Sequence, residues 1–194
     1  LRFKGFFRTM IFLPCTTSLV AYAIIFRSLF ANDGLVNYVL VNLGILDKPY
    51  NFLTQPFAAK MVIILALLWR WTGYNMVFFL SGLQNIEYSV YEAAKIDGAS
   101  AIQTFFKITV PLLKPTILLT AIMSTNGTLQ LFDESINLTD GGPANASISM
   151  SHYIYNLCFK YVPNFGYAAA MSFFILLLVA VLAFIQMRVG DKRD

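Results

Sequence analysis

Four long apolar runs constrain this chain more than any other feature of its sequence. They cover about residues 7–30, 57–83, 112–132 and 167–187. A helix of about 20 residues, rising about 1.5 Å per residue, crosses the hydrocarbon core of a membrane. Because lipid offers no partners to backbone N–H and C=O groups, such runs must be helical. The sequence therefore predicts an all-α, multi-pass membrane bundle, with residues 1–194 forming a single membrane domain.

Composition supports lipid as the solvent of these runs. Hydrophobic residues make up 58% of the chain and charged residues only 12%, whereas a soluble domain is nearer half apolar and a quarter charged. The net charge of +4 would indicate a nucleic-acid partner only if the basic residues clustered in a soluble domain. They lie mainly at the ends of apolar runs, so membrane lipid is expected as a partner and nucleic acid is not.

Two prolines and a polar loop refine this picture. Pro14 falls in the second turn of the 7–30 run, where we expect a mild bend rather than the end of the helix. Pro115 falls in the first turn of the third run, where its missing donor costs little. Residues 32–55 are rich in Asn, Gly and Asp, which predicts a loop with a short interfacial helix.

The positions of Lys and Arg predict the orientation in the membrane, because these residues are enriched on the cytoplasmic side. One side would hold nine of them: Arg2, Lys4, Arg8, Lys95, Lys107, Lys114, Arg188, Lys192 and Arg193. The other side would hold four: Arg27, Lys48, Lys60 and Lys160. This distribution places the N-terminus, the segment between the second and third runs, and the C-terminus in the cytoplasm.

That cytoplasmic segment, residues 87–111, contains small and charged residues. Residues 91–101 predict a short helix with Glu92 in its first turn, where a carboxylate meets the helix dipole favourably. Its alanines offer a small-residue face suited to close docking, and Gly98 permits a tight turn. An ordinary solvated connector would explain these features equally well.

The same segment resembles the cytoplasmic signature of permease subunits of ATP-binding-cassette importers. The matching residues are Glu92, Ala93, Ala94, Asp97, Gly98, Ile108 and Pro111. Residues 132–133, 138–143 and 165–170 are similar to the carbohydrate-importer branch, and residues 145–157 look most like lactose or arabinose permeases within it. The sequence departs from the family at Glu87, where Pro is usual, and at Val110, where Leu is common.

This resemblance implies a subunit that transports a sugar, such as a disaccharide like lactose, across the bacterial inner membrane. It implies three partners: a dimer of ATP-binding subunits, a second permease subunit and an extracellular solute-binding protein. The chain would be no enzyme and would bind no cofactor, since it lacks a Gly-x-x-x-x-Gly-Lys-Ser/Thr phosphate-binding sequence. Such permeases usually carry six spans, so four imply about two more upstream.

Polar and aromatic residues inside two of the runs predict the substrate pathway, because such residues tend to face the interior of a bundle. They are Trp69, Arg70, Trp71, Tyr74 and Asn75 in the second run, and Asn126, Thr128 and Gln130 in the third. Aromatic faces stack on sugar C–H groups, while amides and guanidinium bond hydroxyls, and the resemblance implies that these regions line the translocation site. Interhelical hydrogen bonding is the competing interpretation.

Three polar residues remain open or peripheral at this stage. Asp133 and Glu134, near the outer end, could serve equally in a salt bridge, a contact with the binding protein or a sugar contact. His152, the single histidine, is predicted to lie at the membrane interface. No spacing of Cys, His or acids predicts a metal site.

Other classes of protein fit less well. An importer for glycerol phosphate would favour more buried cations than Arg70 alone, and importers for amino acids or ions stay open. An intramembrane enzyme would need paired catalytic groups at membrane depth, and all ten acids lie in loops or at the ends of runs. A membrane scaffold would explain the apolar runs but not the signature at 87–111.

Overall fold

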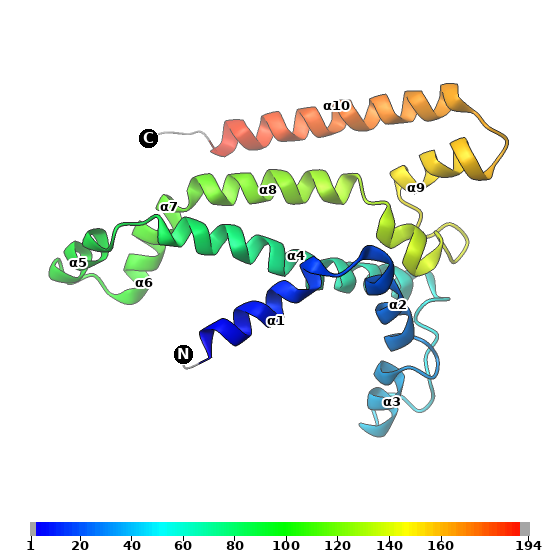
Figure 1. Ribbon diagram of the computed structural model, residues 1–194, viewed down its shortest axis with the longest axis horizontal. Coiled ribbons are helices and arrows are strands. Elements are labelled where there is room, and N and C mark those ends of the chain that lie inside the picture. The colour runs from blue at the N-terminus through cyan, green and yellow to red at the C-terminus, as the bar shows by residue number, and fades with distance from the viewer. Residues whose placement is uncertain (1–2, 191–194) are drawn as a thin grey trace.

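The computed structural model describes residues 3–190, and over this range the regular secondary structure is helical, with no strand. Four helices pack side by side in the order α1, α4, α8, α10 (Figure 1). Their bounds are Lys4–Thr16, Pro56–Gln84, Lys114–Leu129 and Phe165–Gly190. The prediction of an all-α membrane bundle is confirmed.

The shorter elements gather at the two ends of this bundle (Figure 1). The start of α1, the end of α10, and helices α5 (Tyr88–Ile96) and α6 (Ala101–Thr104) lie toward one end. Helices α2 (Leu19–Leu29), α3 (Leu35–Asn42) and α9 (Met150–Tyr155) lie toward the other. This is the arrangement that the charge-based orientation requires, although Arg2, Lys192 and Arg193 lie outside the described residues.

Within residues 3–190, two helices are each long and apolar enough to cross a membrane, α4 and α10. Two further pairs of helices meet the same test only if each bent pair is taken as one span. The first pair is α1 and α2, which meet at 104°. The run at 7–30 is therefore not one gently bent helix, and that prediction was wrong.

The break in the first run has a local cause. Pro14 cannot donate to the helical ladder, and three residues later the backbone turns extended at Thr17 and Ser18. The Ser18 hydroxyl then accepts from the Ala21 N–H at 3.1 Å and caps the new helix. Serine at such a position favours a helix start, and here it begins α2 in a new direction.

The third run is shorter than predicted. Helix α8 ends at Leu129 rather than near 132, and the helical stretch before it, 101–112, is bent from it by 64°. Pro115 lies at the start of α8, as predicted. The short helix expected within 32–55 is α3.

The packed core lies where α2 crosses α4 and a π-helical turn at Ser135–Thr139. Its fully buried members are Tyr22, Ala23, Phe26, Val62, Ile63, Ala66 and Leu138. Helix α1 crosses α4 at Gly73, where a Cβ would overlap the Ile11 carbonyl oxygen, so only glycine permits this approach. Most apolar side chains of α10 are exposed, as expected for a helix that faces lipid.

Candidate functional site

A cavity of about 430 Å³ lies between α4 and the end of α8, and we call it the α4–α8 cavity. Four residues of the predicted substrate pathway line it, namely Arg70, Trp71, Tyr74 and Gln130. The other lining residues are Cys15, Leu19, Gly127, Leu131, Phe132, Asp133 and Glu134. The cavity therefore combines three aromatic rings, an amide, a guanidinium and two carboxylates, a set suited to a polar ligand with apolar C–H faces.

The aromatic wall is fixed by the packing of α4 against α8. The rings of Trp71 and Tyr74 meet edge to face with centroids 5.5 Å apart. The Trp71 ring lies directly over Gly127, where an added Cβ would come within 2.6 Å of the ring. Gly127 therefore sets the position of Trp71, a role missed at the sequence level. A glycine inside a helical run was the available signal.

The Arg70 guanidinium is paired with the carboxylate of Glu134, another residue that lines the cavity. Its Nη1 lies 3.5 Å from Oε1 of Glu134, and the two side chains are 27% and 6% exposed. The guanidinium also lies 5.9 Å from the centre of the Tyr22 ring, within range of a cation–π interaction. Of the roles left open for Glu134, the structure places it in a salt bridge.

The other four predicted pathway residues lie outside this cavity, and three of them, Trp69, Asn75 and Thr128, make contacts of their own. Trp69 points to the other side of α4, where its ring stacks on Tyr22 at 6.1 Å and contacts Phe26. The amide of Asn75 donates to the Ser124 hydroxyl at 3.5 Å, joining α4 to α8. The Thr128 hydroxyl donates to the backbone carbonyl of Ser124 at 2.8 Å. Of these contacts, only the bond between Asn75 and Ser124 joins two helices, as the helix-joining interpretation requires, whereas the Thr128 bond lies within α8.

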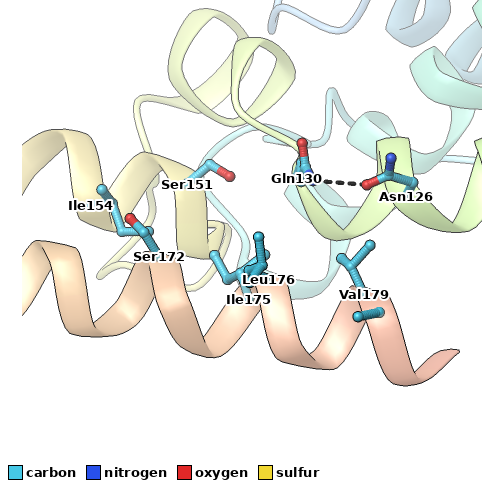
Figure 2. A pocket seen from close by; sticks show the side chains of 9 residues that line it. Asn126, Gln130, Ser151, Ile154, Ser172, Ile175, Leu176 and Val179 are labelled. Atoms are coloured by element: carbon cyan, nitrogen blue, oxygen red, sulfur yellow. Dashed lines mark hydrogen bonds between the residues drawn. The ribbon is translucent and has the colours of Figure 1, made fainter. Parts of the chain in front are cut away.

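Asn126 lies in a second cavity of about 550 Å³ between α8, α9 and α10, the α8–α10 cavity. In Figure 2, Asn126 and Gln130 face Ile175, Leu176 and Val179 of α10. The Gln130 amide donates to Oδ1 of Asn126 at 2.8 Å. Gln130 lines both the α4–α8 cavity and the α8–α10 cavity, so its side chain is shared between them.

Residues 87–111 form a helical hairpin between α4 and α8. Helix α5 spans 88–96, so Glu92 lies in its second turn, and the prediction of a helix over 91–101 with Glu92 in the first turn was wrong. Glu87, the residue that departs from the family, is the N-cap of α5. Gly98 has a φ of +75°, a left-handed conformation that favours glycine, and it reverses the chain before α6.

The hairpin presents both charged and apolar groups to its surroundings. Glu92, Ala93, Asp97, Gly98 and Pro111 are exposed, Ile108 is half-buried and Ala94 is buried. The hydroxyls of Tyr91 and Thr109 lie 3.2 Å apart and join the two arms. Ile96 is 85% exposed, and Ile102 and Phe106 are also well exposed. A contiguous segment with these exposed apolar groups is typical of a docking element.

His152, predicted to lie at the membrane interface, is fully buried within the protein, in α9 at one end of the bundle. Its Nδ1 lies 2.9 Å from Oγ of Ser135, and its Nε2 lies 3.7 Å from Oδ1 of Asp140. Asp140 is itself paired with Lys160 at 3.1 Å. Ser135 also donates to the Ser147 carbonyl at 2.8 Å, so this group anchors the loop after the π-helical turn. No sequence spacing indicated it, since the contacts depend on the fold of the loop.

Burial of the His152 imidazole predicts that the stability of this loop depends on pH. Burial lowers the pKa of His152, and Asp140 only partly opposes this shift. Between the lowered pKa and the ordinary value of about 6.5, the unfolded segment binds more protons than the folded one. The loop is therefore fully stabilised above about pH 6.5 and loses stability as pH falls toward the lowered pKa. We expect amide hydrogen exchange in residues 140–149, corrected for intrinsic rates, to accelerate over that window.

A matched variant separates titration from packing. His152→Gln keeps a polar side chain near Ser135 but cannot take up a proton in this range. Its exchange rates, after the same correction, should be nearly independent of pH. An equal acceleration on acidification in the native chain and the variant would contradict the role given to His152.

Three features together define a membrane transport component. They are the layered helices, the hairpin at one end of the bundle, and the polar cavity between α4 and α8, the helices that flank the hairpin. Residues 2–193 match the family described as the binding-protein-dependent transport system inner membrane component, and the chain belongs to this family. The resemblance noted at 87–111 is therefore confirmed.

Two relatives illustrate the match. The chain is 56% identical over 195 residues to the lactose transport system permease protein of Rhizobium radiobacter, covering 100% of this chain and 65% of the relative. It is 33% identical over 194 residues to the arabinooligosaccharides transport system permease protein of Bacillus subtilis (strain 168), covering 98% and 61%. The chain thus spans less than two thirds of the length of either relative.

Solved structures show the same architecture. A crystal structure of a bacterial ABC transporter involved in the import of the acidic polysaccharide alginate matches with a TM-score of 0.87 and 25% identity, covering 100% of this chain and 68% of that one. The alginate transporter in complex with an alginate pentasaccharide-bound periplasmic protein matches with a TM-score of 0.78 and 26% identity, covering 98% and 66%.

Proposed function

We propose that this chain belongs to the permease subunit of an ABC importer that carries a sugar, such as a disaccharide, across the bacterial inner membrane. The observation that carries the proposal is the α4–α8 cavity, where Trp71 and Tyr74 form an aromatic wall beside Arg70 and Gln130. Aromatic faces suit the C–H faces of a pyranose, and the polar groups suit its hydroxyls. The names of the relatives, which transport lactose and arabino-oligosaccharides, support this cargo class.

The connectivity suggests how the cavity is driven. The hairpin at 87–111 joins α4 directly to α8, and α4 and the C-terminal end of α8 both contribute to the wall of the cavity. A partner that binds the exposed apolar groups of the hairpin and then moves would tilt both α4 and α8. In this proposal the partner is a dimer of ATP-binding subunits, which hydrolyses ATP in place of this chain and moves the hairpin as it closes.

The remaining partners follow from the same scheme. A second permease subunit completes the pathway, and an extracellular solute-binding protein delivers the sugar at the end that carries α3 and α9. The solved relative bound to a periplasmic protein supports such a partner. In this orientation the hairpin and the C-terminus face the cytoplasm, with both termini on the same side.

Uptake by the complete transporter in proteoliposomes tests this function. ATP-dependent entry of labelled neutral disaccharides is expected, and Trp71→Ala should lower kcat/KM by about tenfold or more, since tenfold corresponds to the loss of about 1.4 kcal/mol of contact. Thr128→Val is the control, because the Thr128 hydroxyl bonds its own helix outside the cavity. Equal uptake by Trp71→Ala and Thr128→Val, at matched protein amounts, would remove the cavity from the pathway.

A further inference from the structure

We propose that the α4–α8 cavity selects uncharged saccharides over saccharides that carry a carboxylate or a phosphate. This inference rests on the proposed function and names the class of cargo at the same site. It follows from the charges on the cavity wall, where one guanidinium faces two carboxylates.

Arg70 is the one cationic side chain among the described residues that line the cavity, and its charge is already balanced. Glu134 lies 3.5 Å from its Nη1, and the carboxylate is almost completely buried. A buried carboxylate without a counter-charge is costly, so Glu134 holds the guanidinium in place. An anionic ligand would have to compete with this internal partner for the same cation.

Asp133 makes the net charge of the cavity wall negative. Asp133 lines the cavity beside Glu134, so the lining residues carry a net charge of −1 when all three groups are ionised. A carboxylate on the ligand would meet like charge in a partly dehydrated space, where such repulsion is stronger than in water. A neutral pyranose meets no such penalty, because its hydroxyls can donate to the Asp133 carboxylate while a ring face contacts Trp71.

The shared fold does not by itself decide the charge of the cargo. The solved relative of closely similar fold imports an acidic polysaccharide, and its sequence is 25% identical to this chain. A difference in preferred charge must therefore come from individual wall residues. Here those residues are Arg70, Asp133 and Glu134.

Direct ligand binding to the complete transporter in lipid nanodiscs, without the solute-binding protein, tests the inference. The probes are lactose and its counterpart in which the galactose C6 hydroxymethyl is oxidised to a carboxylate, and binding is followed by calorimetry. The native transporter should bind lactose at least about tenfold more tightly than the acidic probe. Asp133→Asn and Glu134→Gln should each narrow this ratio by about tenfold, and the double variant should reverse it.

A matched control removes an acid far from the cavity. Asp47→Asn makes the same change in net charge in the exposed loop after α3, and it should leave the ratio unchanged. If Glu134→Gln does not fold, Asp133→Asn alone decides, because within residues 3–190 the Asp133 carboxylate has no hydrogen-bond or ion-pair partner that it must keep.

The outcomes separate the two levels of the proposal. Equal binding of both probes by the native transporter would overturn the charge selection and leave the sugar pathway standing. Equal narrowing in Asp47→Asn would also overturn it. Binding of neither probe, in a transporter that still takes up sugar with its binding protein, would place the sugar outside this cavity and overturn both the cavity assignment and the inference.

Discussion

Replacing Gly98 with Asp is expected to abolish ATP-dependent uptake by the complete transporter while leaving the protein inserted in the membrane. Gly98 holds a φ of +75°, and a residue with a Cβ pays about 1–2 kcal/mol in that conformation. Apart from Gly98 and its two chain neighbours, no atom of residues 3–190 lies within 4 Å of the position that the Cβ would take, so no clash within this part of the subunit is expected. The new carboxylate instead disturbs the turn beside the exposed Ile96 and thus the docking surface. Uptake should fall below about a tenth of native, measured in proteoliposomes at equal protein content.

The chain offers a closely matched control for this experiment. Gly44 has a φ of +69°, also with no atom within 4 Å of an added Cβ, and it lies in the loop at the opposite end of the bundle. Gly44→Asp therefore introduces similar backbone strain and the same charge away from the hairpin. Asn and Asp both tolerate the left-handed region and have similar size, so Gly98→Asn lacks only the charge and should retain more uptake than Gly98→Asp. Normal uptake by Gly98→Asp, or equal losses at positions 44 and 98, would contradict a driving role for the hairpin.

Arg70→Ala should cause the largest loss of stability of any single change in the cavity. It leaves the buried Glu134 carboxylate without a counter-charge, which typically costs about 3–5 kcal/mol. Because the Arg70 side chain is 27% exposed, solvent screens part of this interaction and we expect about 2–3 kcal/mol. Thermal unfolding of the purified transporter measures the effect, and the double variant Arg70→Ala with Glu134→Ala should be more stable than Arg70→Ala alone.

An exposed ion pair in the same chain supplies the comparison. Lys160 and Asp140 are paired at 3.1 Å, but their side chains are well exposed, so Lys160→Ala should cost less than about 1 kcal/mol. An Arg70→Ala transporter that still folds should also show altered sugar affinity if Arg70 contacts the cargo. An Arg70→Ala variant as stable as Lys160→Ala would show that Glu134 does not depend on the guanidinium.

The sequence located the helices better than their directions. Both sides of residues 17–18 are rich in apolar residues, so the 7–30 run gave no sign of a 104° change in direction beyond Pro14 and Ser18. The direction of α1 depends on its contact with α4 at Gly73, a contact between residues far apart in the chain. Hydropathy identifies what is buried in lipid, whereas bends depend on which helix packs against which.

The cavity could be predicted in part, and the helical wheel explains where the prediction stopped. Residues 70, 71 and 74 share one side of α4, while residue 69 lies about 200° from residue 71 around the axis. Trp69 could therefore have been separated from Trp71 by spacing alone, and the structure separates them. The pairing of Arg70 with Glu134 could not be anticipated, because it joins residues 64 positions apart through the tertiary fold.

The lengths of the packed helices have a consequence for the lipid around them. Helix α8 has 16 residues and is about 24 Å long, whereas α4 and α10 have 29 and 26 residues and reach about 43 and 39 Å. A typical hydrocarbon core is about 30 Å thick, so α4 and α10 exceed this thickness, and α8, which lies between them, falls short of it. The long helices must tilt or extend into the headgroups, whereas α8 is long enough to cross the core only together with the bent helical stretch before it, 101–112. A change in bilayer thickness should therefore change the tilt of α4 and, with it, the width of the α4–α8 cavity.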